Sequence, residues 1–339
     1  MNSKDKIKVL VVDDSMVFRE ILSRGLSSDP SIEVVAKAVD PFDARDKIIK
    51  YQPQIITCDI QMPKMNGIEF IKRLMPQYPL PIVVISTISE AVFDAMDAGA
   101  VDFVTKPDIK LVNDVEAFIN EVIIKVKIAS ISKISVLKTN NVITKTNRKS
   151  FIDSGIKIIA IGASTGGTEA INNLLKVMPN SSIPGIVIVQ HIPPVFSRMF
   201  AERLDACTQL SVKEAQTGDI VERGRVLIAP GDRHMKIVKH RNTYKVECFI
   251  GDKVNGHCPS VDVLFNSVAK ESKNQAIGII LTGMGYDGAK GLLAMRKAGA
   301  KTIGQDERSS VVYGMPKVAY NIGAVQNQLP LENIGGMVY

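Results

Sequence analysis

The clearest local pattern in the chain is an apolar run that leads into a glycine-rich loop, Ile158-Ile159-Ala160-Ile161-Gly162-Ala163-Ser164-Thr165-Gly166-Gly167. A strand that ends in such a loop, with a helical stretch at 169–177 after it, holds the serine at the carboxyl end of a parallel sheet. The glycines permit a tight turn with positive φ and leave room for a substrate. The Gly162-x-Ser164-x-Gly166 pattern therefore predicts a nucleophile elbow, with N–H groups at the helix start available to an oxyanion.

The same kind of strand–helix turn also binds phosphate, so the motif alone leaves two interpretations open. Ser164 occupies the place of the middle glycine of a G-x-G-x-x-G pattern, and no Gly-Lys-Ser/Thr sequence follows it. Both features disfavour nucleotide binding.

The composition indicates a globular protein of two domains. The chain has 339 residues, of which 45% are hydrophobic and 23% charged. It has no run of 18 apolar residues and no apolar signal-peptide core near Met1, so we expect a cytoplasmic protein without membrane insertion. The four cysteines form neither a C-x-x-C pair nor a zinc spacing, and we expect them to be reduced thiols packed as small apolar side chains: Cys58, Cys207, Cys248 and Cys258.

The charge is unevenly distributed and divides the chain into three parts. The net charge of +7 comprises −3 over residues 1–127, +4 over 128–155 and +6 over 156–339. We take these as a first domain, a basic polar linker and a second domain. The asymmetry fits either nucleic-acid binding or docking of an acidic module on a basic one. The chain has no tryptophan and no basic run with interleaved aromatics, so we expect no nucleic-acid binding.

Both domains have an alternating pattern of strands and helices, which predicts α/β folds with doubly wound parallel sheets. In the first domain the expected strands are Val9–Val12, Glu33–Val39, Ile55–Cys58, Ile82–Ile85 and Asp102–Val104. In the second they are Ile158–Ile161, Ile186–Gln190, Val226–Ile228 and Ile277–Leu281. The segments Met235–Val238 and Lys245–Ile250 are expected to form a small antiparallel hairpin.

Three carboxylates are expected at one edge of the first sheet. Asp13 and Asp14 follow the first strand, and Asp59 stands at the end of the third. Thr87 and Lys106 follow the fourth and fifth strands. Two unit charges about 4 Å apart repel by roughly 4 kcal/mol at an effective dielectric of 20. A hard divalent cation would relieve this, so the cluster predicts a Mg²⁺ site. The alternative, a set of solvated strand-end aspartates, does not account for the threonine and lysine in register.

Residues 8–127 thereby resemble a two-component response-regulator receiver domain. The resemblance rests on these residues and on Cys58-Asp59-Ile60-Gln61-Met62-Pro63 followed by Met65-Asn66-Gly67. It implies a five-stranded flavodoxin-like fold, phosphorylation of Asp59 by a histidine kinase and Mg²⁺ bound by Asp13, Asp14 and Asp59. It also implies that Thr87 and Lys106 bind the phosphoryl oxygens and that Phe103 is the aromatic switch residue. Gln61 departs from the acidic residue expected there.

A serine nucleophile needs a base, and the base needs an orienting group. His191 follows the next strand after Ser164, which predicts that both lie at one sheet edge, and His257 is a second loop candidate. Asp287, in a glycine-rich stretch after the strand 277–281, could supply the carboxylate, although it could also simply cap a helix. The order Ser164, His191, Asp287 differs from that of α/β-hydrolases.

Together with the first domain, residues 156–339 resemble the chemotaxis protein-glutamate methylesterases, the CheB family. The motifs are Gly162-Ala163-Ser164-Thr165-Gly166-Gly167, Gln190-His191-x-Pro193, Ala229-Pro230-Gly231, Pro259-Ser260-Val261-Asp262 and Leu281-Thr282-Gly283-Met284-Gly285-x-Asp287-Gly288. The resemblance implies Ser164 as nucleophile, His191 as acid and base and Asp287 as orienting carboxylate. It also implies an oxyanion contact from the Met284 N–H and an active-site position for Thr165. Cys258 stands where an arginine is usual.

The activity implied is hydrolysis of glutamate γ-methyl esters on methyl-accepting chemoreceptors, with release of methanol, and deamidation of receptor glutamines. No cofactor is expected for the ester chemistry. We further expect the unphosphorylated receiver to cover the Ser164 site. The alternative is a response regulator whose second domain is non-catalytic or binds DNA, for which a small helix-turn-helix and a basic recognition helix would be needed.

Overall fold

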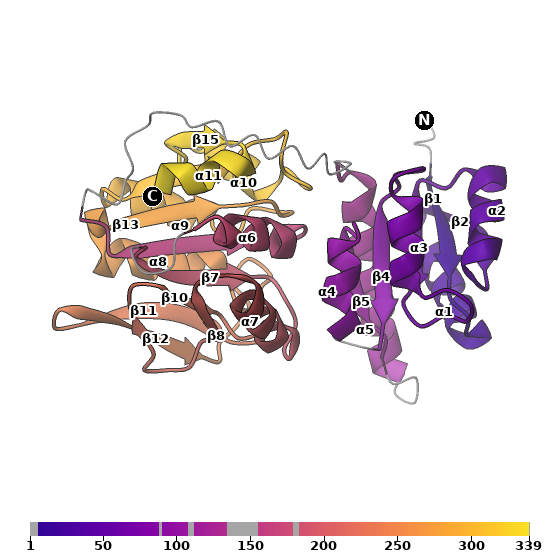
Figure 1. Ribbon diagram of the computed structural model, residues 1–339, viewed down its shortest axis with the longest axis horizontal. Coiled ribbons are helices and arrows are strands. Elements are labelled where there is room, and N and C mark those ends of the chain that lie inside the picture. The colour runs from indigo at the N-terminus through magenta and orange to yellow at the C-terminus, as the bar shows by residue number, and fades with distance from the viewer. Residues whose placement is uncertain (1–5, 88–89, 108–111, 134–154, 179–182, 339) are drawn as a thin grey trace. The chain divides into compact units, whose positions relative to one another are not determined.

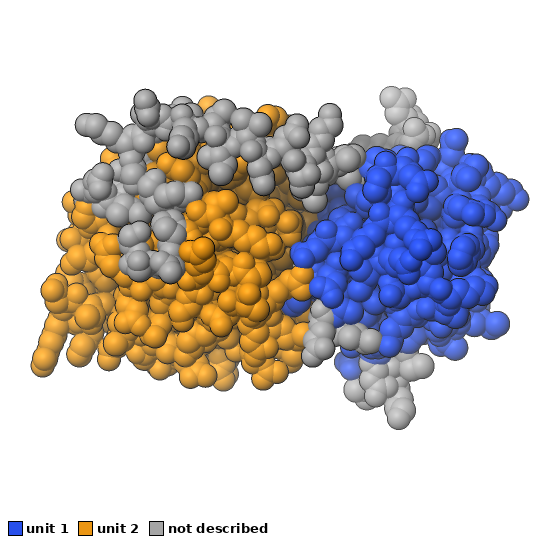
Figure 2. All heavy atoms as spheres, viewed as in Figure 1, with its two compact units in different colours: residues 1–138 blue, residues 139–339 orange. Residues whose placement is uncertain are grey.

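The computed structural model describes residues 6–87, 90–107, 112–133, 155–178 and 183–338. The chain separates into two compact units, residues 1–138 and 139–339, which Figure 2 colours separately. The predicted linker 128–155 begins inside a helix that ends at Ser130, and its residues 134–154 lie outside the described part of the chain.

The first unit contains the predicted five-stranded parallel sheet in the order β2-β1-β3-β4-β5 (Figure 1). The strands are β1 (Ile7–Val12), β2 (Ile32–Ala38), β3 (Ile55–Asp59), β4 (Ile82–Ser86) and β5 (Asp102–Thr105). The helices are α1 (Met16–Ser27), α2 (Pro41–Tyr51), α3 (Gly67–Leu74), α4 (Glu90–Asp97) and α5 (Val112–Ser130). Helix α1 packs on α5 and α3 on α4, which covers both faces and buries strands β3 and β4 throughout.

Local sequence sets where these helices begin. The Ser15 hydroxyl accepts a hydrogen bond from the Phe18 N–H at the start of α1, and the Asp40 carboxylate accepts two at the start of α2. The Asn66 side chain accepts one from the Glu69 N–H in α3. Such N-caps satisfy N–H groups that lack a partner within the helix. The Ser15 cap starts α1 directly after Asp13 and Asp14, whereas a longer connection separates Asp59 at the end of β3 from the start of α3 at Gly67.

The second unit is built on a seven-stranded parallel sheet in the order β15-β14-β13-β6-β7-β10-β8. Its strands are β6 (Ile158–Ala163), β7 (Gly185–Gln190), β8 (Ser211–Glu214), β10 (Arg225–Ile228), β13 (Ala276–Ile280), β14 (Lys301–Gln305) and β15 (Asn327–Leu329). Its α-helices are α6 (Gly167–Lys176), α7 (Phe196–Cys207), α8 (Val261–Glu271), α9 (Ala289–Lys297), α10 (Met315–Asn321) and α11 (Leu331–Val338). A 3₁₀ turn, η2 (Lys273–Gln275), precedes β13.

A small antiparallel sheet covers part of this unit, and it is larger than the predicted hairpin. β11 (His234–His240) pairs with β12 (Thr243–Phe249), as expected, and β9 (Ile220–Val221) adds a third strand. Helix α8 packs between this sheet and the large one, against β11 on one side and β6 on the other (Figure 1). Its apolar residues Leu264, Phe265 and Val268 are fully buried there.

Strand β6 lies at the centre of the large sheet, between β7 and β13. The register pairs Gly162 with Ile280 on one side and Ala163 with Gln190 on the other. Because all three strands are parallel, the residues that follow them meet at one edge, as the sequence predicts for Ser164 and His191.

One expectation about the cysteines is wrong. All four are free thiols and Cys58 is buried, but Cys207 is exposed rather than packed in the core. It lies at the last position of α7, where the Sγ approaches the Asn172 side chain at 3.3 Å. Across the described residues, no helix is both long enough and apolar enough to cross a membrane.

Candidate active site

The Ser164 loop is a sharp turn between β6 and α6. The Ser164 N–H donates to the Thr282 carbonyl at 3.0 Å, and the Ser164 carbonyl accepts from the Gly167 N–H at 2.7 Å. Gly166 has φ 75° at the N-cap of α6, and a Cβ on Gly167 would lie 2.1 Å from the Gln190 side-chain oxygen. Only glycines fit this path, which leaves the partly exposed Ser164 on the tip of the loop.

His191 follows directly after β7 and is tied to the same loop. The backbone N–H of His191 donates to the Ala163 carbonyl at 3.1 Å. The imidazole is 8% exposed, and Nε2 lies 2.9 Å from Asp287 Oδ2. A carboxylate can only accept, so Nε2 carries the proton and Nδ1 has the lone pair. Nδ1 is buried and has no hydrogen-bond partner in the described structure; in particular, the Ser164 hydroxyl is not bonded to it.

Asp287 is buried, and its carboxylate accepts five hydrogen bonds. Besides His191, the donors are the Ser260 hydroxyl at 2.7 Å, the Asn255 amide at 2.8 Å and the backbone N–H groups of Val261 at 2.7 Å and Asp262 at 3.2 Å. Burial by itself raises the pKa of Asp287, but the hydrogen bonds from His191 and Asn255 outweigh it and hold that pKa well below the usual aspartate range. The group is therefore an anion at neutral pH.

The alternative that Asp287 caps the helix that follows it is wrong. The N-cap of the following helix, α9, is Gly288, and no side chain caps it. Asp287 binds the first N–H groups of α8 instead, whose own N-cap, Ser260, makes no side-chain cap bond because its hydroxyl donates to Asp287. A carboxylate at a helix N-terminus is favoured by the helix dipole. One side chain thus joins the start of α8 to the edge of His191.

The loop after β13 supplies the remaining predicted site residues. A Cβ on Gly283 would lie 2.7 Å from Ser164 Cβ, so this glycine lies directly against the serine, and Met284 is the next residue. Thr165 is buried, and its carbonyl accepts from the Thr282 hydroxyl at 3.0 Å. The structure therefore gathers Ser164, His191, Asp287, Thr165 and the 283–284 peptide at one sheet edge.

Three further residues at this site were not assigned roles from the sequence. His257, noted only as a loop candidate, stacks on His191 with 3.7 Å between ring centroids and 11° between planes. Ser260 and Asn255 both bind Asp287. The Pro259-Ser260-Val261-Asp262 motif marked the neighbourhood of Ser260, but no sequence pattern connects Asn255 with a carboxylate 32 positions later.

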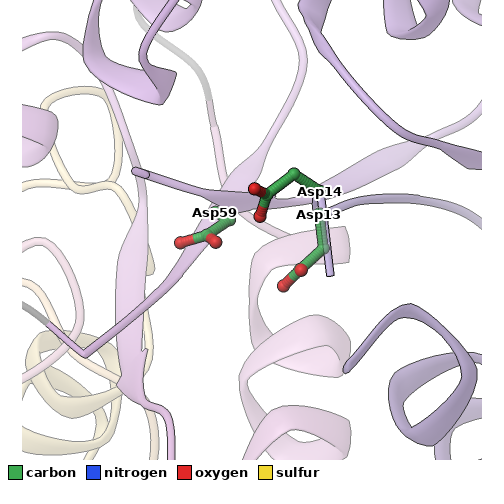
Figure 3. A group of neighbouring side chains, drawn as sticks. All are labelled: Asp13, Asp14 and Asp59. Atoms are coloured by element: carbon green, nitrogen blue, oxygen red, sulfur yellow. The ribbon is translucent and has the colours of Figure 1, made fainter. Parts of the chain in front are cut away.

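The second candidate site lies at the strand ends of the first unit, where Asp13, Asp14 and Asp59 converge (Figure 3). Each can offer one oxygen such that all three lie within 4.8 Å of one another, and only Asp14 is exposed. Lys106 Nζ lies 2.6 Å from Asp59 Oδ2 and 2.8 Å from Asp13 Oδ2. This set of hard oxygen donors fits Mg²⁺.

Charge and burial oppose one another in this cluster. Burial raises the pKa of Asp13, although Lys106 lowers it. For Lys106, burial favours the neutral form, but the hydrogen bonds that its ammonium donates to Asp13 and Asp59 outweigh burial and raise the pKa of Lys106. Thr87 is exposed at the end of β4, and its hydroxyl donates to the Gln61 side chain at 3.4 Å. Phe103 is buried in β5 and packs edge-on against Phe93.

Both units are similar to known proteins. Residues 159–338 match the CheB methylesterase family and residues 9–116 the response regulator receiver domain. A Syntrophomonas wolfei protein-glutamate methylesterase/protein-glutamine glutaminase is 58% identical over 98% of this chain and 97% of its own. A Salmonella typhi protein of the same name is 45% identical over 97% and 95%. The Thermotoga maritima CheB methylesterase catalytic domain superposes with a TM-score of 0.52 at 38% identity, over 54% of this chain and 97% of that structure.

Proposed function

The chain belongs to the CheB methylesterase family, and we propose from its geometry how it carries out that family's reaction. The activity is that of a protein-glutamate methylesterase and protein-glutamine glutaminase, a hydrolase joined to a receiver domain. It removes methyl groups from glutamate side chains and ammonia from glutamine side chains. The DNA-binding alternative for the second unit finds no support, because that unit is a large parallel sheet of the methylesterase type.

We propose that Ser164 is the nucleophile and His191 the acid and base. Ser164 Oγ attacks the ester carbonyl while His191 Nδ1 takes the hydroxyl proton. The tetrahedral intermediate collapses, and His191 gives that proton to the departing methanol. Water then attacks the acyl-enzyme by the same route, which releases glutamate and restores Ser164. With a glutamine substrate, ammonia leaves in place of methanol.

The observation that carries this proposal is the state of the His191 ring. The Asp287 carboxylate accepts from Nε2 at 2.9 Å, while Nδ1 is buried and has no hydrogen-bond partner among the described residues. The only lone pair of the ring is therefore the one left for a proton from the serine. Serine proteases of the chymotrypsin type use the two ring nitrogens the other way round, with the aspartate on Nδ1. Before substrate binds, a loose serine–histidine contact is common in such sites.

The oxyanion is proposed to bind at the Met284 backbone N–H, next to the glycine that packs against Ser164, with Thr165 in the same site. Donors fixed in advance where charge develops supply a large part of the rate in acyl transfer. The backbone on both sides is held by hydrogen bonds: the Thr282 hydroxyl donates to the Thr165 carbonyl at 3.0 Å, and the N–H of Gly283, the neighbour of Met284, donates to the Val312 carbonyl at 3.0 Å.

The receiver is proposed to regulate this site through phosphorylation of Asp59 by a histidine kinase. Asp13, Asp14 and Asp59 would hold Mg²⁺, which when bound neutralises charge on the phosphoryl oxygens. Lys106 and Thr87 would bind those oxygens. We propose that the domain 1–127, through the linker 128–155, covers the site of the domain 156–339 until it is phosphorylated; a fragment starting at Ile156 would then exceed the unphosphorylated chain in activity. The substrates are proposed to be methyl-accepting chemoreceptors.

The test is methanol release from methylated receptor membranes by the wild type and by Ser164→Ala, each with and without a small phosphodonor and Mg²⁺. Release that rises with phosphodonor in the wild type and is absent in Ser164→Ala supports both parts of the proposal. Release that persists in Ser164→Ala would make the glycine-rich turn a binding loop and refute the serine mechanism.

A further inference from the structure

A tight turn beside the active site contacts both the face of His191 and the carboxylate at its edge. Val254 and His257 form a two-way bridge, in which each N–H donates to the other carbonyl at 3.0 Å. Between them Asn255 has φ 54° and Gly256 has φ 84°. Asparagine is among the few residues other than glycine that adopt this left-handed region readily, so the pair suits the turn.

The Asn255 side chain lies between two buried carboxylates. Its Nδ2 donates to Asp287 Oδ1 and to Asp262 Oδ2, each at 2.8 Å. Asp262 and Asp287 are 5% and 1% exposed. Both partners are carboxylate oxygens, which fixes the orientation of the amide, because a flipped oxygen would face two acceptors. One amide group thus satisfies both anions and separates them.

The two carboxylates differ in their pKa although they share this donor. Burial raises the pKa of Asp262, and the negative charge of Asp287 adds to the rise. The other oxygen of Asp262 is held by the Gly291 N–H at 2.6 Å, so this side chain is anchored to α9. Asp287 has the larger set of donors and remains the anion that faces His191. A shift of Asn255 would let the two groups repel and move the carboxylate that orients the ring.

We propose that Asn255 is a positioning residue, which acts through Asp287 to fix the ring and tautomer of His191, while His257 of the same turn packs on the ring face. The proposal rests on the function proposed above, in which His191 is the base. The contacts of the described structure bring three titratable groups to the ring: Asp287 at Nε2, His257 on the ring face and, through Asn255, Asp262. His234 lies one step further away, where its Nδ1 accepts from the Ser260 N–H.

Two substitutions test this without straining the turn. Asn255→Gly keeps the left-handed backbone and removes both hydrogen bonds. It is expected to lower kcat by about 10- to 100-fold with KM changed less than about two-fold, since a small misplacement of a catalytic group costs that much. Asn255→Asp is isosteric and replaces the amide donor by a carboxyl group within hydrogen-bond distance of the Asp262 and Asp287 carboxylates. Because three such groups cannot all be ionised, one of them holds a proton that is lost as the pH rises, and the pH profile of kcat/KM is expected to change shape relative to that of the wild type.

The controls separate the possible outcomes. Asn242→Asp makes the same substitution in the exposed β11–β12 turn and should leave the pH profile in place. Folded fraction is measured by circular dichroism for each full-length variant. The proposal is overturned if both Asn255 variants keep kcat within two-fold and the pH profile of the wild type. It is equally overturned if their losses match the folded fraction alone. Activity in Ser164→Ala would instead refute the proposed function itself.

Discussion

Replacement of Asp287 by asparagine should reduce activity and stability together, for reasons that the hydrogen bonds make explicit. The asparagine oxygen can still accept from Ser260 and Asn255, but its amide nitrogen then faces the Val261 N–H and His191 Nε2, which both point donors at it. His191 can relieve its clash only by moving the proton to Nδ1. That tautomer cannot accept the proton of Ser164, so kcat should fall by roughly 10⁴-fold, as for the equivalent change in a serine protease.

The cost in stability comes from the start of α8. A buried, unsatisfied Val261 N–H costs about 1–3 kcal/mol, and loss of the charge at the helix N-terminus adds up to about 2 kcal/mol. The total of roughly 1–5 kcal/mol lowers the Tm of a domain of this size by about 2–20 °C. Asp306→Asn is the matched control, because Asp306 accepts from the Ser309 N–H and hydroxyl at the end of β14 and touches no histidine.

The measurements are methanol release at saturating substrate and calorimetry of the full chain. Asp306→Asn should keep the wild-type kcat, whereas Asp287→Asn should be inactive even at temperatures where it is fully folded. An Asp287→Asn protein that retains kcat within ten-fold of the wild type would refute the claim that this carboxylate sets the tautomer of His191.

Three further results are expected. Gly162→Ala should lower the free energy of unfolding by about 1–3 kcal/mol and lower kcat, because the added Cβ would lie 2.1 Å from Val261 Cγ1 and push α8 away from Asp287. The control is Gly336→Ala, whose Cβ meets open space and should leave urea unfolding unchanged. Because the pKa of Asp287 is depressed in the folded state, its stabilising effect should be complete above about pH 4 and fade below it. The difference in the free energy of unfolding between the wild type and Asp287→Asn, measured in urea, should therefore narrow from pH 6 to pH 3. A difference that stays constant would contradict this. Removal of Mg²⁺ with EDTA should abolish the mass increase of phosphorylation at Asp59 with a small phosphodonor, and a persistent increase would disprove the cation site.

Much of the fold follows from short-range sequence features. Buried β-branched runs gave the central strands, such as Ile55–Asp59 and Ile158–Ala163, nearly to the residue, because burial on both faces demands unbroken apolar runs. The outer strands β8, β14 and β15 of the second sheet were not predicted, whereas the edge strands β2 and β5 of the first sheet were. β14 has the sequence Lys-Thr-Ile-Gly-Gln and β15 has three residues, so neither offers a period that distinguishes it from a loop.

The active-site residues likewise divide into those that the sequence predicts and those that it does not. Ser164 and His191 follow adjacent central strands, so parallel topology places them together at one edge. Asn255 and the N-terminus of α8 reach Asp287 only through tertiary packing, across 32 and 26 positions of sequence. Hydrogen bonds of this kind leave no periodic trace in one sequence. The exposure of Cys207 is a similar case, since it depends on where α7 ends against its neighbours.

A common acyl-enzyme at Ser164 is tested most directly by partitioning with hydroxylamine. If methyl ester and amide substrates pass through the same glutamyl-serine, a given hydroxylamine concentration must yield the same ratio of hydroxamate to glutamate from both, after subtraction of the background with Ser164→Ala. Equal ratios are the predicted result. Ratios that differ between ester and amide would show that no shared covalent intermediate forms, and would contradict the proposed role of Ser164.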